Sequence, residues 1–118
     1  MFATYILASQ RNGTIYVGST DDLMRRVWEH REKMRQGFTT RYDVSQLVWF
    51  ESHETREGAF QRERRIKEWR RSWKIMLIEA QNPDWRDLYE DLVGGGLTAS
   101  EWLAALDDGS LDGRLGDL

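Results

Sequence analysis

The dipeptide Asn12-Gly13 constrains this chain most strongly, because it is the short sequence most typical of a β-hairpin turn. Both residue types tolerate the positive φ that primed turns need. The flanking residues 4–7 and 14–17 are rich in β-branched and aromatic side chains, which favour strands. Because side chains alternate along a strand, any register that pairs odd with even positions places Tyr5 and Tyr16 on one face. We therefore predict a hairpin whose two tyrosines share a surface.

A helix is predicted to follow the hairpin, over about residues 21–35, and to end before Gly37. The residues from Ser19 to Asp22 offer N-cap side chains and first-turn carboxylates, which stabilise a helix start. One stripe at helical spacing carries apolar residues and one histidine, and Arg26 precedes that histidine by four positions. The members of the stripe are Leu23, Val27, His30 and Met34.

The remainder of the core is predicted as one strand over residues 47–53 and a helix over about 55–71, followed by a short helix over 73–80. Ser72 is the expected N-cap of that short helix, and Asn82-Pro83 ends it. Residues 84–92 are expected to form one or two further helical turns. In the longer helix, Ala59, Ile66 and Trp73 form an apolar stripe into which Glu63 falls.

These elements predict an α+β fold, in which a three-stranded antiparallel sheet is flanked by helices. With 118 residues the chain fits one domain over residues 1–92, with an acidic extension over 93–118. Gly94-Gly95-Gly96 is the expected linker. Residues 98–101, TASE, form a capping box for a short tail helix that carries Trp102.

The net charge of −3 conceals an uneven distribution along the chain. Residues 1–74 hold 15 Lys and Arg against 10 Asp and Glu, whereas residues 75–118 hold 2 against 10. The basic part suits a polyanion, and the acidic tail conceals this in the total charge. No apolar run reaches the roughly 20 residues of a membrane span, and there is no cysteine, so a cytoplasmic protein is expected. The predicted nucleic-acid contacts are Arg25, Arg41, Arg62, Lys67 and Arg70.

Each of these side chains also has an ordinary structural interpretation. Tyrosines are common in strands, a histidine on an apolar stripe is typically a hydrogen-bonded core residue, and Glu63 could pair with Arg26 or Arg70. In combination, however, they match the needs of phosphodiester hydrolysis. A carboxylate holds Mg²⁺, an arginine neutralises the phosphoryl oxygens, and a tyrosine or His30 takes the proton of the attacking water.

The series of motifs resembles that of the GIY-YIG nuclease superfamily. Ala3-Thr4-Tyr5 stands at the first motif triplet and Tyr16-Val17-Gly18 at the second. The resemblance continues through LMRRVWEHR, LVWFE and AFQRERRIKEWRRSWKIMLIEAQNPDW, and so covers about residues 2–90. Within that superfamily the chain resembles in particular the small stand-alone bacterial proteins, which are similar to the N-terminal nuclease domain of the excision-repair incision protein.

The resemblance implies a function for five positions and a looser one for a sixth. The motif tyrosines, the helix arginine and the histidine of some members correspond to Tyr5, Tyr16, Arg26 and His30, and the metal-binding glutamate corresponds to Glu63. An accessory asparagine of some members corresponds to Asn82. The chain departs from the family pattern in the first triplet, which lacks its Gly and Ile, and at Ser19, where the repair nuclease has a lysine.

The leading hypothesis is a divalent-metal-dependent endonuclease that cuts DNA in repair or recombination, with Mg²⁺ as cofactor and Mn²⁺ as a substitute. It requires the second helix to bring Glu63 to the tyrosine face of the sheet. The alternative is a nucleic-acid binding module that is non-catalytic or depends on a targeting protein partner. A third hypothesis is that the tail helix around Trp102 docks a protein or covers the basic face as an autoinhibitor.

Overall fold

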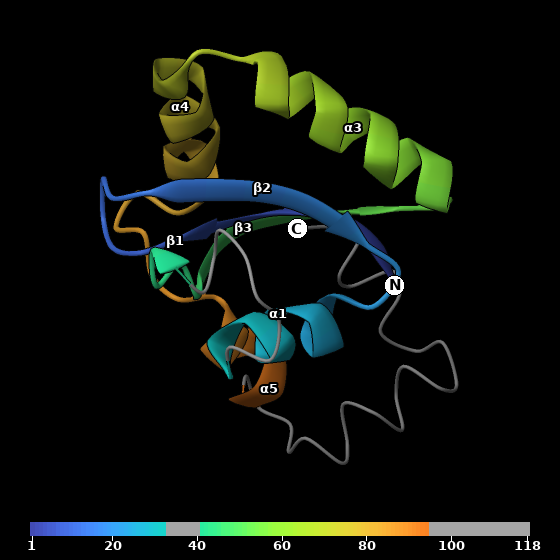
Figure 1. Cartoon of the computed structure of the whole chain (residues 1–118), viewed down its shortest axis with the longest axis horizontal. Helices are drawn as coiled ribbons and strands as arrows, with labels where there is room; N and C mark the ends of the chain where they lie inside the picture. The colour runs from blue at the N-terminus through green and yellow to red at the C-terminus, as the bar shows by residue number, and fades with distance from the viewer. Residues whose placement is uncertain (33–40, 95–118) are drawn as a thin grey trace.

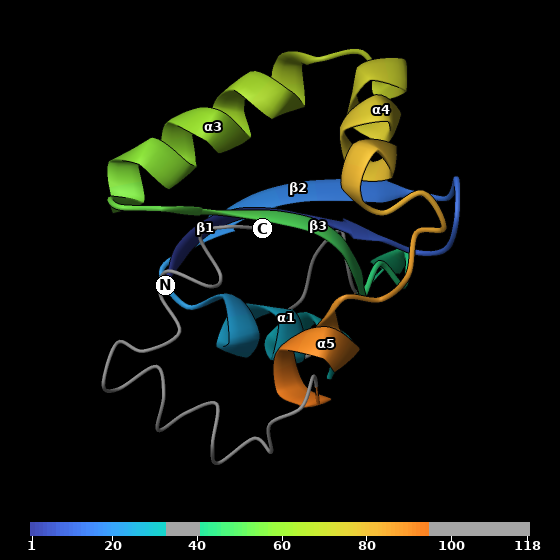
Figure 2. The ribbon, with the colours of Figure 1, turned by 180° about the vertical axis from the view of Figure 1, so that it is seen from behind.

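A computed structural model describes residues 1–32 and 41–94 of the chain as three layers. Helices α3 and α4 cover one face of a β-sheet, and α1 and α5 cover the other (Figure 1; the view from behind is Figure 2). This arrangement confirms the predicted α+β class. The elements are β1 (Phe2–Ala8), β2 (Ile15–Thr20), α1 (Leu23–Arg31), β3 (Gln46–His53), α3 (Arg56–Glu68), α4 (Arg71–Gln81) and α5 (Tyr89–Gly94).

The sheet has the strand order β2-β1-β3, and both pairs are antiparallel. Tyr5 pairs with Gly18 and Leu7 pairs with Tyr16, so the predicted odd–even register is confirmed. The two tyrosines therefore lie on the same face, as alternation requires. The central strand β1 is buried from Ala3 to Ala8, and β2 is left as an edge strand.

The hairpin is present, but its turn differs from the predicted primed turn at Asn12-Gly13. The backbone N–H of Gly13 donates to the carbonyl of Gln10 at 2.9 Å, so the turn lies one residue earlier. Of the pair Asn12-Gly13, only Asn12 takes the left-handed conformation, with φ 58°. Gly13 is needed for a different reason, because a Cβ there would lie 2.3 Å from the Oγ of Ser9. The guanidinium of Arg71, from α4, donates to the carbonyls of Asn12 and Gly13 and holds this turn.

The two faces of the sheet carry separate apolar clusters. On the α1 side, Leu23 and Val27 pack with Tyr5 and Leu7, and His30 is buried beside them. These three members of the predicted stripe are confirmed, and the fourth, Met34, lies outside the described residues. The cluster on the other face packs α3 and α4 against the sheet. Its members are Ile6, Ala8, Val17, Val48, Trp49, Ile66, Ile78 and Trp85.

The helical boundaries after β3 correct two predictions. Helix α3 ends at Glu68, and Trp69 and Arg70 are extended, with ψ near 150°. This break resets the helical phase, so Trp73 leaves the predicted apolar stripe and is 48% exposed. Arg70, rather than Ser72, is the N-cap of α4, and it makes no side-chain capping bond.

The segment after α4 is fastened to the start of β3. The buried side-chain amide of Asn82 donates to the carbonyls of Val48 and Arg86, and its oxygen accepts the N–H of Arg86. Asp87 accepts the backbone N–H of Leu47 and pairs with Arg31 of α1. Because all of these groups are partnered, this irregular connection can lie against the sheet.

Several predicted features lie outside the described residues. These are the end of the first helix near Arg35, the residues around Gly37, the linker beyond Gly94 and the tail helix around Trp102. Within residues 1–32 and 41–94, no helix is long and apolar enough to cross a membrane.

The hydrogen bonds of Asn82 predict a measurable loss of stability on truncation. Asn82→Ala leaves the buried carbonyl of Val48 without this donor, which should lower the free energy of unfolding by about 1–3 kcal/mol. Urea denaturation followed by tryptophan fluorescence measures the change. Gln81→Ala is the control, because Gln81 is exposed at the end of the same helix. Equal stabilities of the two variants would contradict a structural role for Asn82.

Candidate functional site

Three aromatic rings gather on the α1 face of the sheet. The hydroxyl of Tyr5 lies 3.2 Å from Nε2 of His30, in a buried hydrogen bond that joins β1 to α1. The ring centroid of Tyr16, on β2, is 6.3 Å from that of Tyr5 and 5.5 Å from that of His30. Tyr5 is fully buried and His30 nearly so, whereas Tyr16 is half-buried. Among the three, the ring of Tyr16 is the most accessible from solvent.

Gly18 makes room for this aromatic cluster. A Cβ at Gly18 would lie 2.6 Å from Cζ and from the hydroxyl of Tyr5, and 3.0 Å from Cε1 of Tyr16. Real Cβ atoms essentially never approach other atoms this closely, so any side chain here would displace the tyrosines. The glycine of the second motif triplet therefore has a packing function that its sequence position alone did not reveal.

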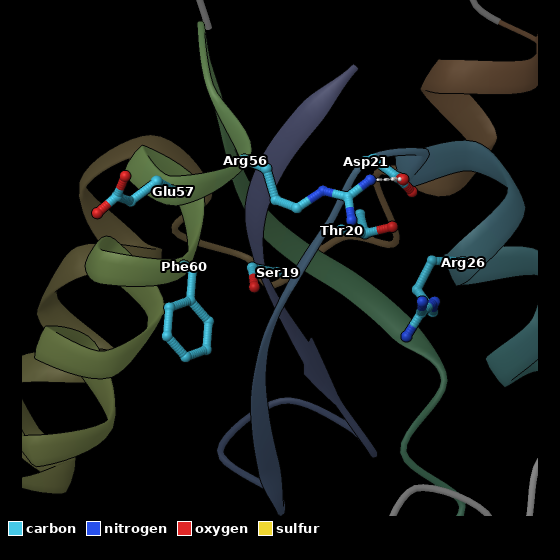
Figure 3. Close-up of a pocket in the computed structure, with 7 residues that line it drawn as sticks. All are labelled: Ser19, Thr20, Asp21, Arg26, Arg56, Glu57 and Phe60. Carbon is cyan, nitrogen blue, oxygen red and sulfur yellow. Dashed lines mark hydrogen bonds and ion pairs between the residues drawn. The ribbon is translucent and has the colours of Figure 1, made fainter.

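A groove of about 550 Å³ crosses the edge strand β2 between α1 and α3. Figure 3 shows Arg26 of α1 on one side, Phe60 of α3 on the other, and Ser19 of β2 between them. Arg26 is partly exposed and lies 3.6 Å from the carboxylate of Glu29. The remaining lining residues are Thr20, Asp21, Arg56 and Glu57.

The mouth of this groove is lined by charges of both signs. Arg56 pairs with Asp21 at 2.5 Å, and both groups are largely exposed. A second groove adjoins the first and shares Arg26 and Arg56 with it, and Arg25 also lines it. Three arginines therefore border two adjoining grooves, which also contain the carboxylates of Asp21, Asp22, Glu29 and Glu57. Guanidinium groups are the side chains that match the oxygens of a phosphate.

Glu63 lies on the other side of the sheet from the tyrosines, and this corrects the expectation that they share a face. Its Oε1 accepts a hydrogen bond from Oγ of Ser19 at 2.7 Å, and its Oε2 pairs with Nζ of Lys67 at 2.9 Å. Ser19 is adjacent to Gly18 on β2 and so points to the opposite face. Glu63 is nevertheless connected to the side of the sheet that carries Arg26, because its partner Ser19 lines the same groove as Arg26 at the edge of β2.

Glu63 makes one carboxylate available to a hard cation such as Mg²⁺, which prefers oxygen ligands. In the described part of the chain, no group of three or more His, Cys, Asp or Glu side chains could hold a metal ion. The carboxylate of Glu63 and the hydroxyl of Ser19 are two oxygen ligands within hydrogen-bond distance of each other. Mg²⁺ commonly takes one or two protein carboxylates and keeps several waters, so one carboxylate fits such an ion only where water and substrate phosphate complete its shell. In the structure, Oε2 of Glu63 is paired with the half-exposed Lys67.

The basic residues predicted to contact nucleic acid differ in their surroundings. Arg25 borders the second groove, and Lys67 is paired with Glu63. Arg62 is engaged with Glu51 of β3 and lies over the rings of Trp49 and Trp69, so its guanidinium supports the fold. The exposed residues Arg41 and Arg70 each lie over a neighbouring aromatic ring, those of Tyr42 and Trp73.

Sequence reasoning missed several residues of the site. The sequence identifies Ser19 as a candidate N-cap and as the position where the repair nuclease has a lysine, but it gives no sign that the Ser19 hydroxyl contacts Glu63. Phe60 and Arg56 were part of a predicted helix without an assigned role, yet both line the groove. Asn82, the accessory position, bonds only backbone groups of Val48 and Arg86 in the contacts described above.

Comparison with known proteins finds related sequences. Residues 1–76 match the family described as the GIY-YIG catalytic domain. The chain is 39% identical over 66 residues to a UPF0213 protein of Haloquadratum walsbyi, a match that covers 56% of this chain and 74% of the relative. It is 32% identical over 68 residues to a UPF0213 protein of Bacillus pumilus, covering 58% of this chain and 69% of that relative.

A solved structure also matches. The solution NMR structure of a UPF0213 protein from Bacillus halodurans is 24% identical, with a TM-score of 0.47, over 75% of this chain and 94% of that one. The match to the catalytic domain spans both tyrosine triplets, Arg26, His30 and Glu63. The chain therefore belongs to the GIY-YIG family, whose catalytic domain is a nuclease domain.

Proposed function

We propose that this protein is a Mg²⁺-dependent endonuclease that hydrolyses phosphodiester bonds of DNA. The observation that carries the proposal is the groove across β2, which places Arg26 on one side and Ser19, the hydrogen-bond partner of Glu63, at its centre. The aromatic cluster lies on the Arg26 side of the same strand. A phosphodiester in this groove would meet Arg26 directly and Glu63 through its partner Ser19, while Tyr16 lies on the same strand outside the lining residues.

Arg26 has the function of stabilising the charge that develops on the phosphoryl oxygens. Its guanidinium presents a planar set of donors that matches two oxygens of a phosphate. The ion pair with Glu29, at 3.6 Å, is long and partly exposed, so it orients the arginine without preventing it from binding an anion. Arg25 and Arg56 border the same depression and would contact neighbouring phosphates.

Tyr16 is proposed as the group that takes the proton of the attacking water. It is the most accessible of the three rings, whereas Nε2 of His30 is already bonded to the buried hydroxyl of Tyr5. Tyr5 and His30 then act as positioning residues, because they fix the wall against which the Tyr16 ring lies. Because Gly18 has no side chain, the rings of Tyr5 and Tyr16 can pack directly against β2.

Glu63, with Ser19 beside it, is the proposed holder of the Mg²⁺ ion, for which Mn²⁺ would substitute. The bound ion would polarise the phosphate and lower the pKa of a coordinated water. Glu63 is suited to this because its side chain is only 12% exposed and remains attached to a rigid helix. Lys67, the present partner of Oε2, is half-exposed on the next turn and can move into solvent.

The alternative, a module that binds nucleic acid without cutting it, is favoured by one observation. Both oxygens of Glu63 are already partnered, by Ser19 and by Lys67. A panel of flap, branched, single-stranded and duplex DNA, with RNA counterparts, in Mg²⁺ and in Mn²⁺ separates the two functions. Cleavage of any DNA supports the endonuclease, whereas binding without cleavage throughout supports the binding module.

The proposed function includes a role in DNA repair or recombination, with a protein partner that directs the enzyme to its DNA.

The metal function of Glu63 predicts the behaviour of Glu63→Gln. Loss of the negative charge should lower the single-turnover rate of DNA cleavage in Mg²⁺ at least about 100-fold, because a bound metal supplies several kcal/mol of transition-state stabilisation. Glu68→Gln is the matched control, since it removes the same charge from an exposed position of α3. If Glu63→Gln keeps its circular dichroism spectrum and cleaves as fast as the control, the metal function of Glu63 is wrong.

The assignment of the base predicts different effects for two tyrosines. Tyr16→Phe keeps the ring but removes the hydroxyl, and should slow cleavage by about 10²–10⁴-fold. Tyr42→Phe, at an exposed tyrosine outside the aromatic cluster, should cleave at the rate of the parent. The pH–rate profiles of both variants and of His30→Gln are the measurement. A full rate in Tyr16→Phe together with a large loss in His30→Gln would transfer the role of base to His30.

A further inference from the structure

Phe60 is an exposed aromatic residue in a place where the fold does not need one. Its neighbour Ala59 is buried beneath α3, where its carbonyl accepts the hydroxyl of Thr4, so Phe60 turns away from this contact. The side chain of Phe60 is 47% exposed and lines the groove (Figure 3). Large apolar side chains that stay exposed in a groove are typical of binding surfaces.

The position of Phe60 on its helix relates it to the proposed metal ligand. Phe60 precedes Glu63 by three residues, so the two side chains are neighbours on the same side of α3. Arg64, four residues after Phe60, has its guanidinium carbon 5.7 Å from the ring centroid. The aromatic ring thus lies one helical turn from the carboxylate, with a cation beside it.

Across the groove from Phe60 is Arg26, and Arg56 borders the same space. The α3 side of the groove therefore offers the ring of Phe60, with Glu57 beside it, and the α1 side offers the guanidinium of Arg26. Arg56 also comes from α3, and its guanidinium is paired with Asp21. A nucleotide has the complementary features, since a flat base can stack on an aromatic side chain while its phosphate pairs with arginine. Pairing of a base face with Phe60 and of a phosphate with Arg26 would use both walls at once.

We infer that the groove takes an unpaired nucleotide, whose base stacks on Phe60 while the adjoining phosphate lies at Arg26. In a duplex the faces of each base are covered by its stacked neighbours, so an aromatic ring gains a base face only where the strand is single or the stack is open. The inference rests on the proposed nuclease function and names its substrate class. Strands with unpaired nucleotides at the cleavage point, such as single strands or frayed junctions, are the substrates.

The test measures binding without chemistry, in EDTA. Fluorescence anisotropy of a labelled 12-nucleotide dT strand and of a labelled 12-base-pair duplex gives the two affinities for the full chain. Phe60→Ala should weaken binding of the dT strand by about 5- to 100-fold, the range of base–aromatic stacking, and change duplex binding less than about twofold. Phe60→Trp should keep or increase the single-strand affinity because indole also stacks.

Trp73→Ala is the matched control. Trp73 is 48% exposed and has Arg70 over its ring, as Phe60 has Arg64, but it does not line the groove. Trp73→Ala should leave the affinity for the dT strand within about twofold of the parent. Phe60→Leu, which keeps apolar area without a flat ring, guards against a loss of folding, and should weaken binding as Phe60→Ala does.

Three outcomes would overturn the inference: no binding of the dT strand by the parent chain, equal losses for strand and duplex in Phe60→Ala, or parental affinity in Phe60→Ala. Failure of the proposed function has a different signature. If Phe60→Ala loses single-strand affinity selectively while the parent cuts no substrate in Mg²⁺ or Mn²⁺, the nucleotide site stands and the nuclease function falls. If the parent cuts DNA and Phe60→Ala binds strand and duplex as the parent does, the nuclease function stands alone.

Discussion

The hydrogen bond between Tyr5 and His30 is the interaction on which the arrangement of the site depends. It joins the central strand to α1 inside the core, and it is possible only because Gly18, on the neighbouring strand, has no side chain to fill the space beneath Tyr5. Once this contact is made, α1 is fixed against the sheet through Leu23 and Val27. Arg26, on the same helix, is thereby held at the border of the groove.

The second determinant is that β2 is an edge strand. An interior strand would separate the two faces of the sheet completely, whereas the edge allows side chains from α1 and α3 to line one groove across it (Figure 3). Successive residues of β2 serve opposite sides, with Gly18 beneath the tyrosines and Ser19 against Glu63. One short strand therefore connects the aromatic half of the site to the carboxylate half.

The sequence determined the local features and left some long-range relations open. The alternation of Tyr5 and Tyr16, the burial of His30 and the three strands follow from local periodicity, and they are confirmed. Periodicity also places Glu63 toward the sheet, but it cannot say which face α3 will cover, since that depends on the connection after β3. The same limit explains Trp73, whose stripe was broken by two extended residues that carry no glycine or proline to mark them. Ser19 and Phe60 acquire their importance only from what lies across the groove.

The attachment of residues 82–88 to β3 has a consequence for how copies of this protein behave toward one another. The sheet has a second edge, at β3, and exposed edges invite pairing with a strand from another molecule. At the start of β3, the N–H of Leu47 donates to Asp87 and its carbonyl accepts the N–H of Leu88, while the carbonyl of Val48 is taken by Asn82. These backbone groups are hydrogen-bonded within the chain, so this part of the edge cannot pair with a strand of another molecule. Residues 82–88 thereby protect the start of β3 from aggregation by strand addition.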